Sequence, residues 1–268
     1  MDTSAITILS TSLIAIITFM LIRYYKSTHT NRYSKLSYND RVSLKTNLDL
    51  ALNKDNLSER YLRAGRREKK NDFKGAIEDI NVILQHEIDN VELVFKRGLN
   101  KFKISDFKGA IVDFAEVLKN NPKDKYSFYY KGLAYLRLSN FNKAFSDLTS
   151  AITLGINEKE VYFHRGLAEI EVEKYSEAIE DFNLYLGEHP NALEAYMSRG
   201  IAYNKCSNFD FALKDFNKAI DLNPNHEKAY FERAFVKKNL NDLVGYSNDL
   251  KTSYNKGYLH AYHFLKET

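Results

Sequence analysis

The side chains that could carry out catalysis do not gather into a motif in this sequence. Seven histidines occur without metal-ligand spacing, and the pair His260 and His263 has no third ligand beside it. There is no Gly-rich phosphate loop, no GxSxG elbow and no HExxH helix. Cys206 is the single cysteine, which excludes a disulfide within this chain and a cysteine-based zinc site. We expect no enzymatic activity, no cofactor and no metal.

Cations and aspartates recur in pairs that stand 16 residues apart. The cations are Arg63, Arg97, Lys131, Arg165, Arg199 and Arg233, and the aspartates are Asp79, Asp113, Asp147, Asp181, Asp215 and Asp249. Most of the cations are arginines, whose planar fork suits bidentate pairing with a carboxylate. We interpret the series as a structural ion-pair ladder between neighbouring helices. The alternative is a basic ladder that binds phosphates or acidic peptides.

Aromatic and aliphatic side chains form another regular series, and these are the candidate partner-binding residues. They are Tyr61, Phe95, Tyr129, Phe163, Met197 and Phe231 at steps of 34 residues, with Phe102, Leu136 and Ile170 seven residues after three of them. Rigid aromatic anchors suit a groove that takes an apolar peptide or helix. Packing between adjacent helices is the competing interpretation, and it is the more common role of such a stripe.

All of these residues follow a 34-residue repeat. Its marker alanines are Ala76, Ala110, Ala144, Ala178 and Ala212, and the small residues that precede the helix turn are Ala64, Gly98, Gly132, Gly166, Gly200 and Ala234. Each unit predicts two helices that approach closely at the small residues. Short polar turns such as Asn71-Asp72 and Ser139-Asn140 separate them, and their side chains can bond the free N–H groups of the second helix.

With the proline positions Pro122, Pro190 and Pro224, this pattern resembles the tetratricopeptide repeat (TPR). The resemblance implies an all-α fold, a right-handed α-solenoid of about six helix pairs. The expected repeats are 57–90, 91–124, 125–158, 159–192, 193–226 and 227–260, followed by a capping stub at 261–268. Three positions depart from the family pattern: Ile88 and Ile156 replace proline, and Tyr246 replaces alanine.

One known function of the family is not expected here. Chaperone-binding TPR domains hold a C-terminal carboxylate with a Lys and Asn pair, and no repeat of this chain has that pair. TPR arrays bind proteins along their surface, so we expect a protein partner whose identity the sequence does not reveal.

An uncharged apolar segment precedes the repeats. Residues Ala5–Ile22 would span about 27 Å as a helix, close to the hydrocarbon thickness of a bilayer. Asp2 stands before this segment and no small-residue cleavage site follows it, which disfavours a cleaved signal peptide. We expect residues 1–26 to form a transmembrane signal anchor and residues 27–56 a polar tether that includes a candidate capping helix.

The positive charge is concentrated beside this predicted anchor. Residues 23–70 hold 13 Lys and Arg against 5 Asp and Glu, whereas residues 71–268 hold 26 against 29. This asymmetry predicts a single-pass membrane protein with a cytoplasmic repeat body, and it disfavours nucleic-acid binding by the repeats. The basic stretch between Arg60 and Lys70 either contacts anionic lipid head groups or forms a solvated helix face.

Together these features predict a membrane-anchored scaffold or docking receptor that binds a peptide or helix in the TPR groove. Two alternatives are kept. One is a structural or self-associating spacer, which would form a homo-oligomer, and the other is a regulatory subunit of a membrane complex.

Overall fold

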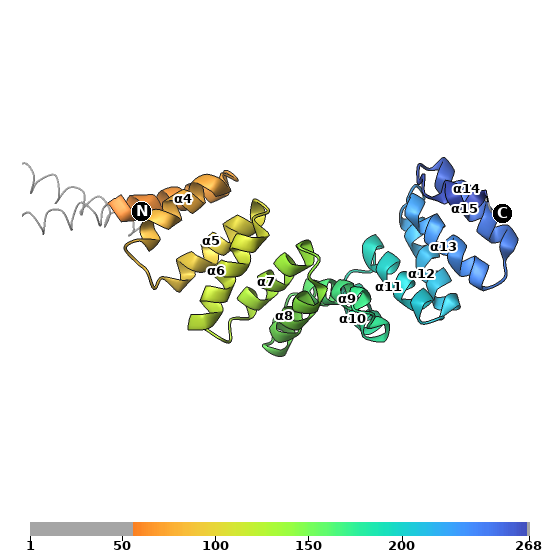
Figure 1. The fold of residues 1–268 in the computed structure, drawn as a ribbon, viewed down its shortest axis with the longest axis horizontal. Coiled ribbons are helices and arrows are strands. Elements are labelled where there is room, and N and C mark those ends of the chain that lie inside the picture. Colours follow the sequence, from red (N-terminus) through yellow and green to blue (C-terminus); the bar gives the residue numbers. More distant parts are fainter. Residues whose placement is uncertain (1–55, 267–268) are drawn as a thin grey trace, which may run out of the picture. The chain divides into compact units, whose positions relative to one another are not determined.

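The computed structural model describes residues 56–266, and the regular elements in this part of the chain are helices. Residues 56–69 are helical. The labelled helices are α4 (Phe73–Leu84), α5 (Val91–Lys103), α6 (Phe107–Asn120), α7 (Lys125–Arg137), α8 (Phe141–Thr153), α9 (Glu160–Glu171), α10 (Tyr175–Glu188), α11 (Leu193–Lys205), α12 (Phe209–Leu222), α13 (Glu227–Asn239), α14 (Leu243–Asn255) and α15 (Ala261–Leu265) (Figure 1). The predicted all-α fold is confirmed for these residues.

The chain divides into two compact units, one that reaches to Ser105 and one that begins at Asp106. The N-terminal unit contains the helix over 56–69, α4 and α5. The C-terminal unit contains α6 to α15, and in it each helix packs against the next along the chain. The second predicted repeat is shared between the units, because α5 is its first helix and α6 its second. The anchor predicted at 1–26 and all but the last residue of the tether predicted at 27–56 lie outside the described residues.

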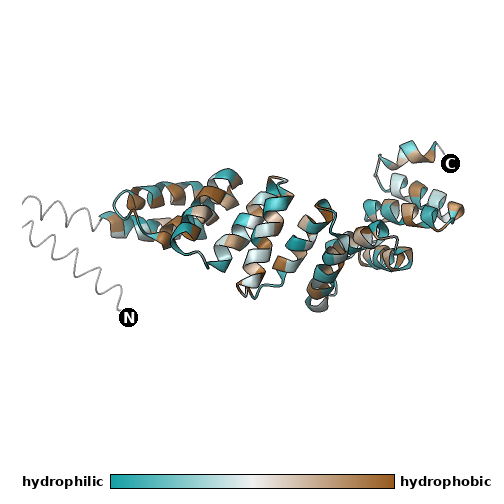
Figure 2. Ribbon diagram, turned by 60° about the horizontal axis from the view of Figure 1, so that its bottom comes forward, coloured by the Kyte–Doolittle hydropathy of each residue, from teal (hydrophilic) through white to brown (hydrophobic). Residues whose placement is uncertain are grey.

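Within residues 56–266, no helix is long and apolar enough to cross a bilayer. The helices are amphipathic instead, with hydrophobic and hydrophilic residues alternating along each of them (Figure 2). This is the pattern of helices that bury one face against neighbours and expose the other.

The turn between the two helices of each predicted repeat has one repeated backbone conformation. A single non-glycine residue with φ between 54° and 63° ends the first helix; these residues are Asn71, Ser105, Ser139, Glu173, Ser207 and Asn241. Asp72, Asp106 and Asp242 each accept a hydrogen bond from the N–H three residues later, as the sequence predicts. Asn140 and Asn208 begin α8 and α12 without such a bond.

Two of the small residues show why the repeat requires them. A Cβ atom on Gly166 would come within 2.9 Å of the Phe182 ring, and one on Gly200 within 2.9 Å of the Phe216 ring. The absence of a side chain therefore allows α9 to approach α10, and α11 to approach α12, closely enough for each ring to be fully buried.

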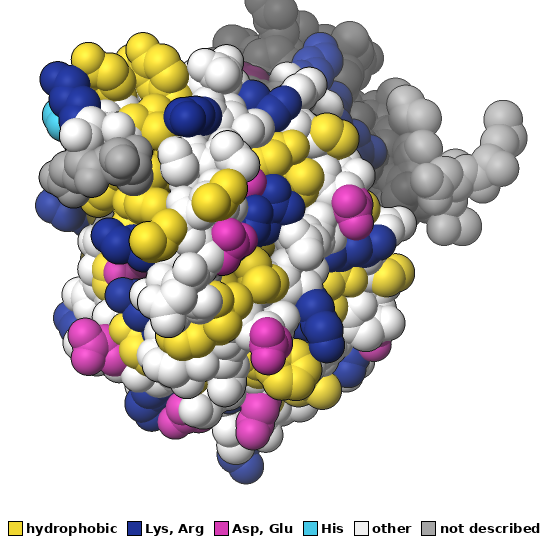
Figure 3. All heavy atoms as spheres, turned by 90° about the vertical axis from the view of Figure 1, so that its right-hand side faces the viewer, with side chains coloured by type: hydrophobic (Ala, Val, Ile, Leu, Met, Phe, Trp, Pro, Cys, Tyr) yellow, Lys and Arg dark blue, Asp and Glu magenta, His cyan; other side chains and the backbone are white. Residues whose placement is uncertain are grey.

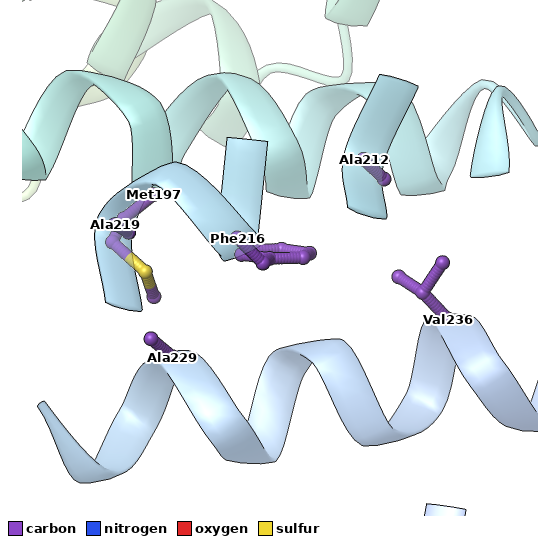
Figure 4. Close-up of a cluster of buried hydrophobic side chains, with 6 residues drawn as sticks. All are labelled: Met197, Ala212, Phe216, Ala219, Ala229 and Val236. Carbon is purple, nitrogen blue, oxygen red and sulfur yellow. The ribbon is translucent and has the colours of Figure 1, made fainter. Parts of the chain in front are cut away.

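The core of the C-terminal unit consists of small clusters between successive helices. One cluster joins α11, α12 and α13 through Met197, Ala212, Phe216, Ala219, Ala229 and Val236 (Figure 4). Phe216 lies at its centre with no exposed surface, and burial of a phenylalanine stabilises a fold by roughly 1.5–3 kcal/mol. Each helix of this unit is therefore fixed by contacts with its sequence neighbours.

The third repeat ends differently from those that end in proline. Gly155 follows α8 with a φ of 76°, a conformation that favours glycine, and Ile156 in the proline position is buried. At the C-terminal end, α15 packs against α14, and its Ala261 is fully buried.

Candidate partner-binding surface

The ion-pair ladder predicted from the sequence is present in five of the six repeats. Arg165 and Asp181 form two hydrogen bonds of 2.7 Å, and Arg199 and Asp215 form two of 2.8 and 2.7 Å. The other three pairs join Arg63 to Asp79, Lys131 to Asp147 and Arg233 to Asp249. Arg97 and Asp113 belong to different units, so their pairing stays a prediction.

The aspartates of the ladder are buried, although carboxyl side chains are mostly exposed in proteins. Asp215 is 4% exposed, and burial raises its pKa even though the Arg199 guanidinium opposes this change. Asp79 behaves in the opposite way: its hydrogen bond from Arg63 lowers its pKa, and Arg60 and Arg67 add to the effect. Because each of these buried carboxylates has its own cation, we interpret the ladder as part of the packing between helices rather than as a ligand site.

Three of the arginines also reach back to the preceding repeat, which the sequence spacing alone did not predict. Nη1 of each donates to an asparagine Oδ1 that stands 16 residues earlier in the chain. The pairs are Arg97 to Asn81 at 3.0 Å, Arg199 to Asn183 at 2.6 Å and Arg233 to Asn217 at 2.6 Å. The guanidinium groups of Arg199 and Arg233 therefore each tie together the second helices of two successive repeats. The regular spacing of these asparagines was the available signal.

The fourth repeat lacks this tie among the described residues. The position 16 residues before Arg165 is Thr149, whose buried Oγ1 has no hydrogen-bond partner within residues 56–266. Arg165 instead lies near a second carboxylate, with 3.6 Å between its Nε and Oε1 of Glu169. Glu169 is 2% exposed, and its Oε2 also has no partner in the described part of the chain.

Glu169 occupies a position that is a cation or a tyrosine in the other repeats, namely Arg67, Lys101, Tyr135, Tyr203 and Lys237. Burial raises the pKa of Glu169 to about 8, and the neighbouring Asp181 adds to the shift. Arg165 acts in the opposite direction, but its guanidinium is already bound to Asp181 through two hydrogen bonds. Burial and the neighbouring Asp181 therefore both favour the protonated form of Glu169.

The predicted aromatic series is placed mainly in the interior of the C-terminal unit. Tyr129, Met197 and Phe231 are buried, at 9%, 3% and 8% exposure. Phe163 is half-buried and packs edge-on against the buried ring of Phe182. These positions match the packing interpretation that the sequence left open. In the N-terminal unit, Tyr61 is exposed and Phe95 is half-buried.

The candidate residues that stand seven positions after members of the aromatic series are more accessible than Tyr129, Met197 and Phe231. Leu136, Ile170 and, in the N-terminal unit, Phe102 are half-buried. In the C-terminal unit, the residue that follows the small residue of the third, fourth and fifth repeats is also a half-buried aliphatic. Together they form a stripe over the first helices of these three repeats, α7, α9 and α11, and we call it the aliphatic stripe: Leu133, Leu136, Leu167, Ile170 and Ile201.

The three helices that carry the aliphatic stripe are neighbours, since α7 contacts α9 and α9 contacts α11. Its members pack against buried clusters that each include residues of the following repeat, while part of their surface stays accessible. Leu133, Leu167 and Ile201 recur at steps of 34 residues in the sequence. The spacing did not show which of the neighbouring apolar columns would be accessible.

Other exposed hydrophobic residues lie at the C-terminal end of the described chain. Leu243, Val244 and Leu259 are 63%, 74% and 72% exposed. On the face turned to the viewer in Figure 3, hydrophobic side chains are interspersed with cations and carboxylates. Small groups of hydrophobic side chains set among charged ones are common on protein surfaces.

Residues 56–266 contain no group of three His, Cys, Asp or Glu side chains that could hold a metal ion. His260 and His263 lie with their rings 6.1 Å apart among the aromatic residues at the C-terminal end. Cys206 is half-buried, and its Sγ lies 4.0 Å from the Ser176 hydroxyl.

Family models described as tetratricopeptide repeat match residues 95–157 and 193–226. These two segments contain tetratricopeptide repeats. This TPR fold is typical of protein–protein interaction, and TPR proteins generally act as non-enzymatic scaffolds. None of the curated proteins matches the sequence.

Solved structures similar to this chain include YrrB, described as a TPR protein with an unusual peptide-binding site. The similarity to YrrB has a TM-score of 0.63 at 14% identity and covers 70% of this chain and 97% of that one. A structure of MamA has a TM-score of 0.57 at 25% identity, covering 64% and 94%. MamA from Desulfovibrio magneticus RS-1 has a TM-score of 0.59 at 17% identity, covering 63% and 95%.

Proposed function

We propose that this chain is a membrane-anchored docking protein that binds a peptide or helix of a partner protein on its TPR surface. The observation that carries the proposal is the aliphatic stripe. Accessible aliphatic side chains on three adjacent first helices offer an apolar track, and a partner can cover it with one face of a helix. YrrB, which has a similar fold, is described as having a peptide-binding site.

The membrane part of the proposal rests on the sequence. The uncharged segment Ala5–Ile22 is long enough to span a bilayer, and Arg23 and Lys26 follow it directly. Under the positive-inside bias, the repeats would face the cytoplasm. An anchor of this kind would hold the TPR surface near a membrane and bring its partner there.

The binding role is tested by affinity capture with the detergent-solubilised full chain, followed by titration of the purified partner. The stripe variant carries Leu136→Gln and Ile170→Gln. The control carries Val112→Gln and Leu184→Gln, which replace exposed aliphatic residues on the second helices α6 and α10. Circular dichroism first establishes that both variants remain helical.

We expect the stripe variant to bind the partner at least tenfold more weakly and the control to bind it normally, since interfacial anchors often contribute more than 1 kcal/mol each. Equal binding by both variants, or capture of copies of this chain alone, would contradict the docking role. Either result would favour the alternative of a structural spacer.

A further inference from the structure

The helix over residues 56–69 and the turn after it form an exposed cationic end of the N-terminal unit. Four exposed cations come from this helix end and the start of α4, and a fifth lies at the end of α5. They are Arg66, Lys69, Lys70, Lys74 and Lys103. We call this group the basic end.

The fold brings these cations to one end of the unit. Asn71 has a φ of 59°, and the Asp72 N–H donates to the Arg67 carbonyl at 2.9 Å, so the chain reverses tightly between the helix and α4. The ammonium group of Lys103 lies 4.7 Å from the centre of the Phe73 ring, which places the end of α5 beside the same turn.

The carboxylates within this segment are already engaged by neighbouring groups. Oε1 of Glu68 accepts a hydrogen bond of 2.6 Å from Asn100. Asp72 accepts the Gly75 N–H and lies 3.4 Å from Arg67. The basic end therefore presents positive charge that these two carboxylates neutralise only in part.

The nearby ladder pair adds to the excess of positive charge. Three guanidinium groups, those of Arg60, Arg63 and Arg67, converge on the single carboxylate of Asp79. Repeats four and five supply one arginine to each ladder aspartate. The first repeat thus carries more cations than its own buried carboxylate requires.

We propose that the basic end binds the phosphate-bearing head groups of an anionic membrane. The charge is complementary, and each cation near an anionic surface contributes favourably. The exposed side chain of Leu62, one helical turn before Arg66, can enter the interfacial region beside the head groups. The inference rests on the proposed membrane anchor only in that the anchor would keep the unit near the bilayer.

A membrane fits the observations better than a nucleic acid does. Residues 71–268 hold more acidic than basic residues, so the cations do not extend along the repeats as a track for a polynucleotide. They form a compact group at one end of one unit, together with an exposed aliphatic side chain.

The test measures energy transfer from a dye on the full chain to lipids that carry an acceptor on the head group. The dye is attached through Ser58→Cys in a Cys206→Ser background, since Ser58 is exposed on the helix that leads into the basic end and is not one of its cations. The vesicles contain phosphatidylcholine alone or with about 30% phosphatidylserine, so that only the surface charge changes.

The charge-reversal variant carries Arg66→Glu, Lys69→Glu and Lys70→Glu. A matched control carries Lys108→Glu, Lys123→Glu and Lys214→Glu, which reverse three cations of the C-terminal unit. A milder variant, Lys69→Gln with Lys70→Gln, serves if circular dichroism shows that the reversal disturbs the helix.

We expect phosphatidylserine to increase energy transfer in the parent chain and in the control. The reversal should weaken the phosphatidylserine-dependent component roughly a hundredfold, and about 0.5 M salt should suppress it. Energy transfer that does not depend on phosphatidylserine would overturn the proposal. So would an equal loss of energy transfer in the charge-reversal variant and in the control.

Tighter binding of single-stranded RNA than of the vesicles by the basic end would also overturn the proposal. Failure of the proposed lipid binding by the basic end is distinguishable from failure of the proposed membrane anchor. A chain that co-sediments with neutral vesicles while showing no response to phosphatidylserine would contradict the basic end and leave the anchor intact.

Discussion

Two joints between successive repeats differ in what their bridging arginine contacts. The first joins the fourth and fifth repeats, and the second joins the third and fourth. At the first, Arg199 binds Asp215 of its own repeat and Asn183 of the preceding one. At the second, Arg165 binds Asp181 and lies near Glu169, while Thr149 stands where the asparagine would be. We call the first joint tied, because its arginine also binds an asparagine of the preceding repeat, and the second joint untied. The same repeat geometry therefore supports both kinds of joint.

The difference between the two joints shows that a regular sequence period does not imply equal stability along the array. The untied joint lies against α9, and α9 carries Leu167 and Ile170 at the middle of the aliphatic stripe. A repeat array is stabilised mainly by its nearest-neighbour interfaces, so a weak interface permits local movement. We infer that α9, at the middle of the proposed binding surface, is less tied to its preceding repeat than α11 is.

The largest expected effect comes from breaking the tied joint. Arg199→Leu leaves Asp215, which is 4% exposed, without its bidentate partner. Removal of one member of a buried ion pair costs about 3–5 kcal/mol because the other charge remains buried. Urea unfolding followed by circular dichroism measures the loss of unfolding free energy.

Lys214→Leu is the control for this experiment, because Lys214 is exposed on α12, the helix that also carries Asp215. It should change the unfolding free energy by less than about 0.5 kcal/mol. A cost below about 1 kcal/mol for Arg199→Leu would mean that the pair contributes little to the joint.

The next effect concerns the untied joint and its dependence on pH. The folded-state pKa of Glu169 is about 8, above its ordinary value of 4.5, so the folded chain binds this proton more tightly than the unfolded chain does. Stability therefore falls as the pH rises from about 4.5 to about 8, and it remains low above that range. Glu169→Gln should remove this penalty and raise the unfolding free energy at pH 9 by on the order of 5 kcal/mol.

Melting temperatures between pH 5 and pH 9 test this prediction, with Glu171→Gln as the control on the exposed face of α9. The Glu169→Gln advantage should be small at pH 5 and greatest at pH 9. A parallel shift of both variants at all pH values would contradict the assignment of the proton to Glu169.

A smaller effect follows from converting the tied joint into the untied type. Asn183→Thr removes the acceptor that lies 2.6 Å from Arg199 Nη1. A hydrogen bond to a charged group contributes about 1.5–3 kcal/mol, and the exposed position of Asn183 places the expected loss near the lower end. Urea unfolding measures it, and an unchanged midpoint would show that the bond does not stabilise the joint.

The smallest effect is expected from the reverse substitution. Thr149→Asn offers Arg165 the acceptor that it lacks within the described residues and removes a buried hydroxyl without a partner there. We expect a gain of about 0.5–1 kcal/mol, since a new hydrogen bond is partly offset by the cost of ordering the side chain. A loss of stability would indicate that the asparagine cannot reach Arg165 at this joint.

The sequence predicted the helix pairs and the ladder because both depend on spacing along one chain. Sixteen residues separate Arg165 from Asp181 in the sequence, and the pair lies in contact in the fold. The close approach at Gly166 was likewise predictable, because a glycine that recurs at one position of a helical repeat marks the place where a neighbouring helix packs closely.

The accessibility of a given column was harder to predict. Tyr129 and Leu136 lie on the same helix and both look suitable for a groove, yet Tyr129 is buried and Leu136 is half-buried with part of its surface accessible. That difference depends on the angle at which successive helices pack, which the period alone does not specify. Glu169 was missed for a related reason, because a single glutamate among many gives no sign of burial.

Hydrogen–deuterium exchange of the full chain at pH 7 and pH 9 tests the difference between the two joints most directly. We predict that backbone amides of α9 exchange faster than those of α11, and that the difference grows at pH 9, where Glu169 loses its proton. Equal protection of α9 and α11 at both pH values would contradict the claim that the joint beside the aliphatic stripe is the weaker one.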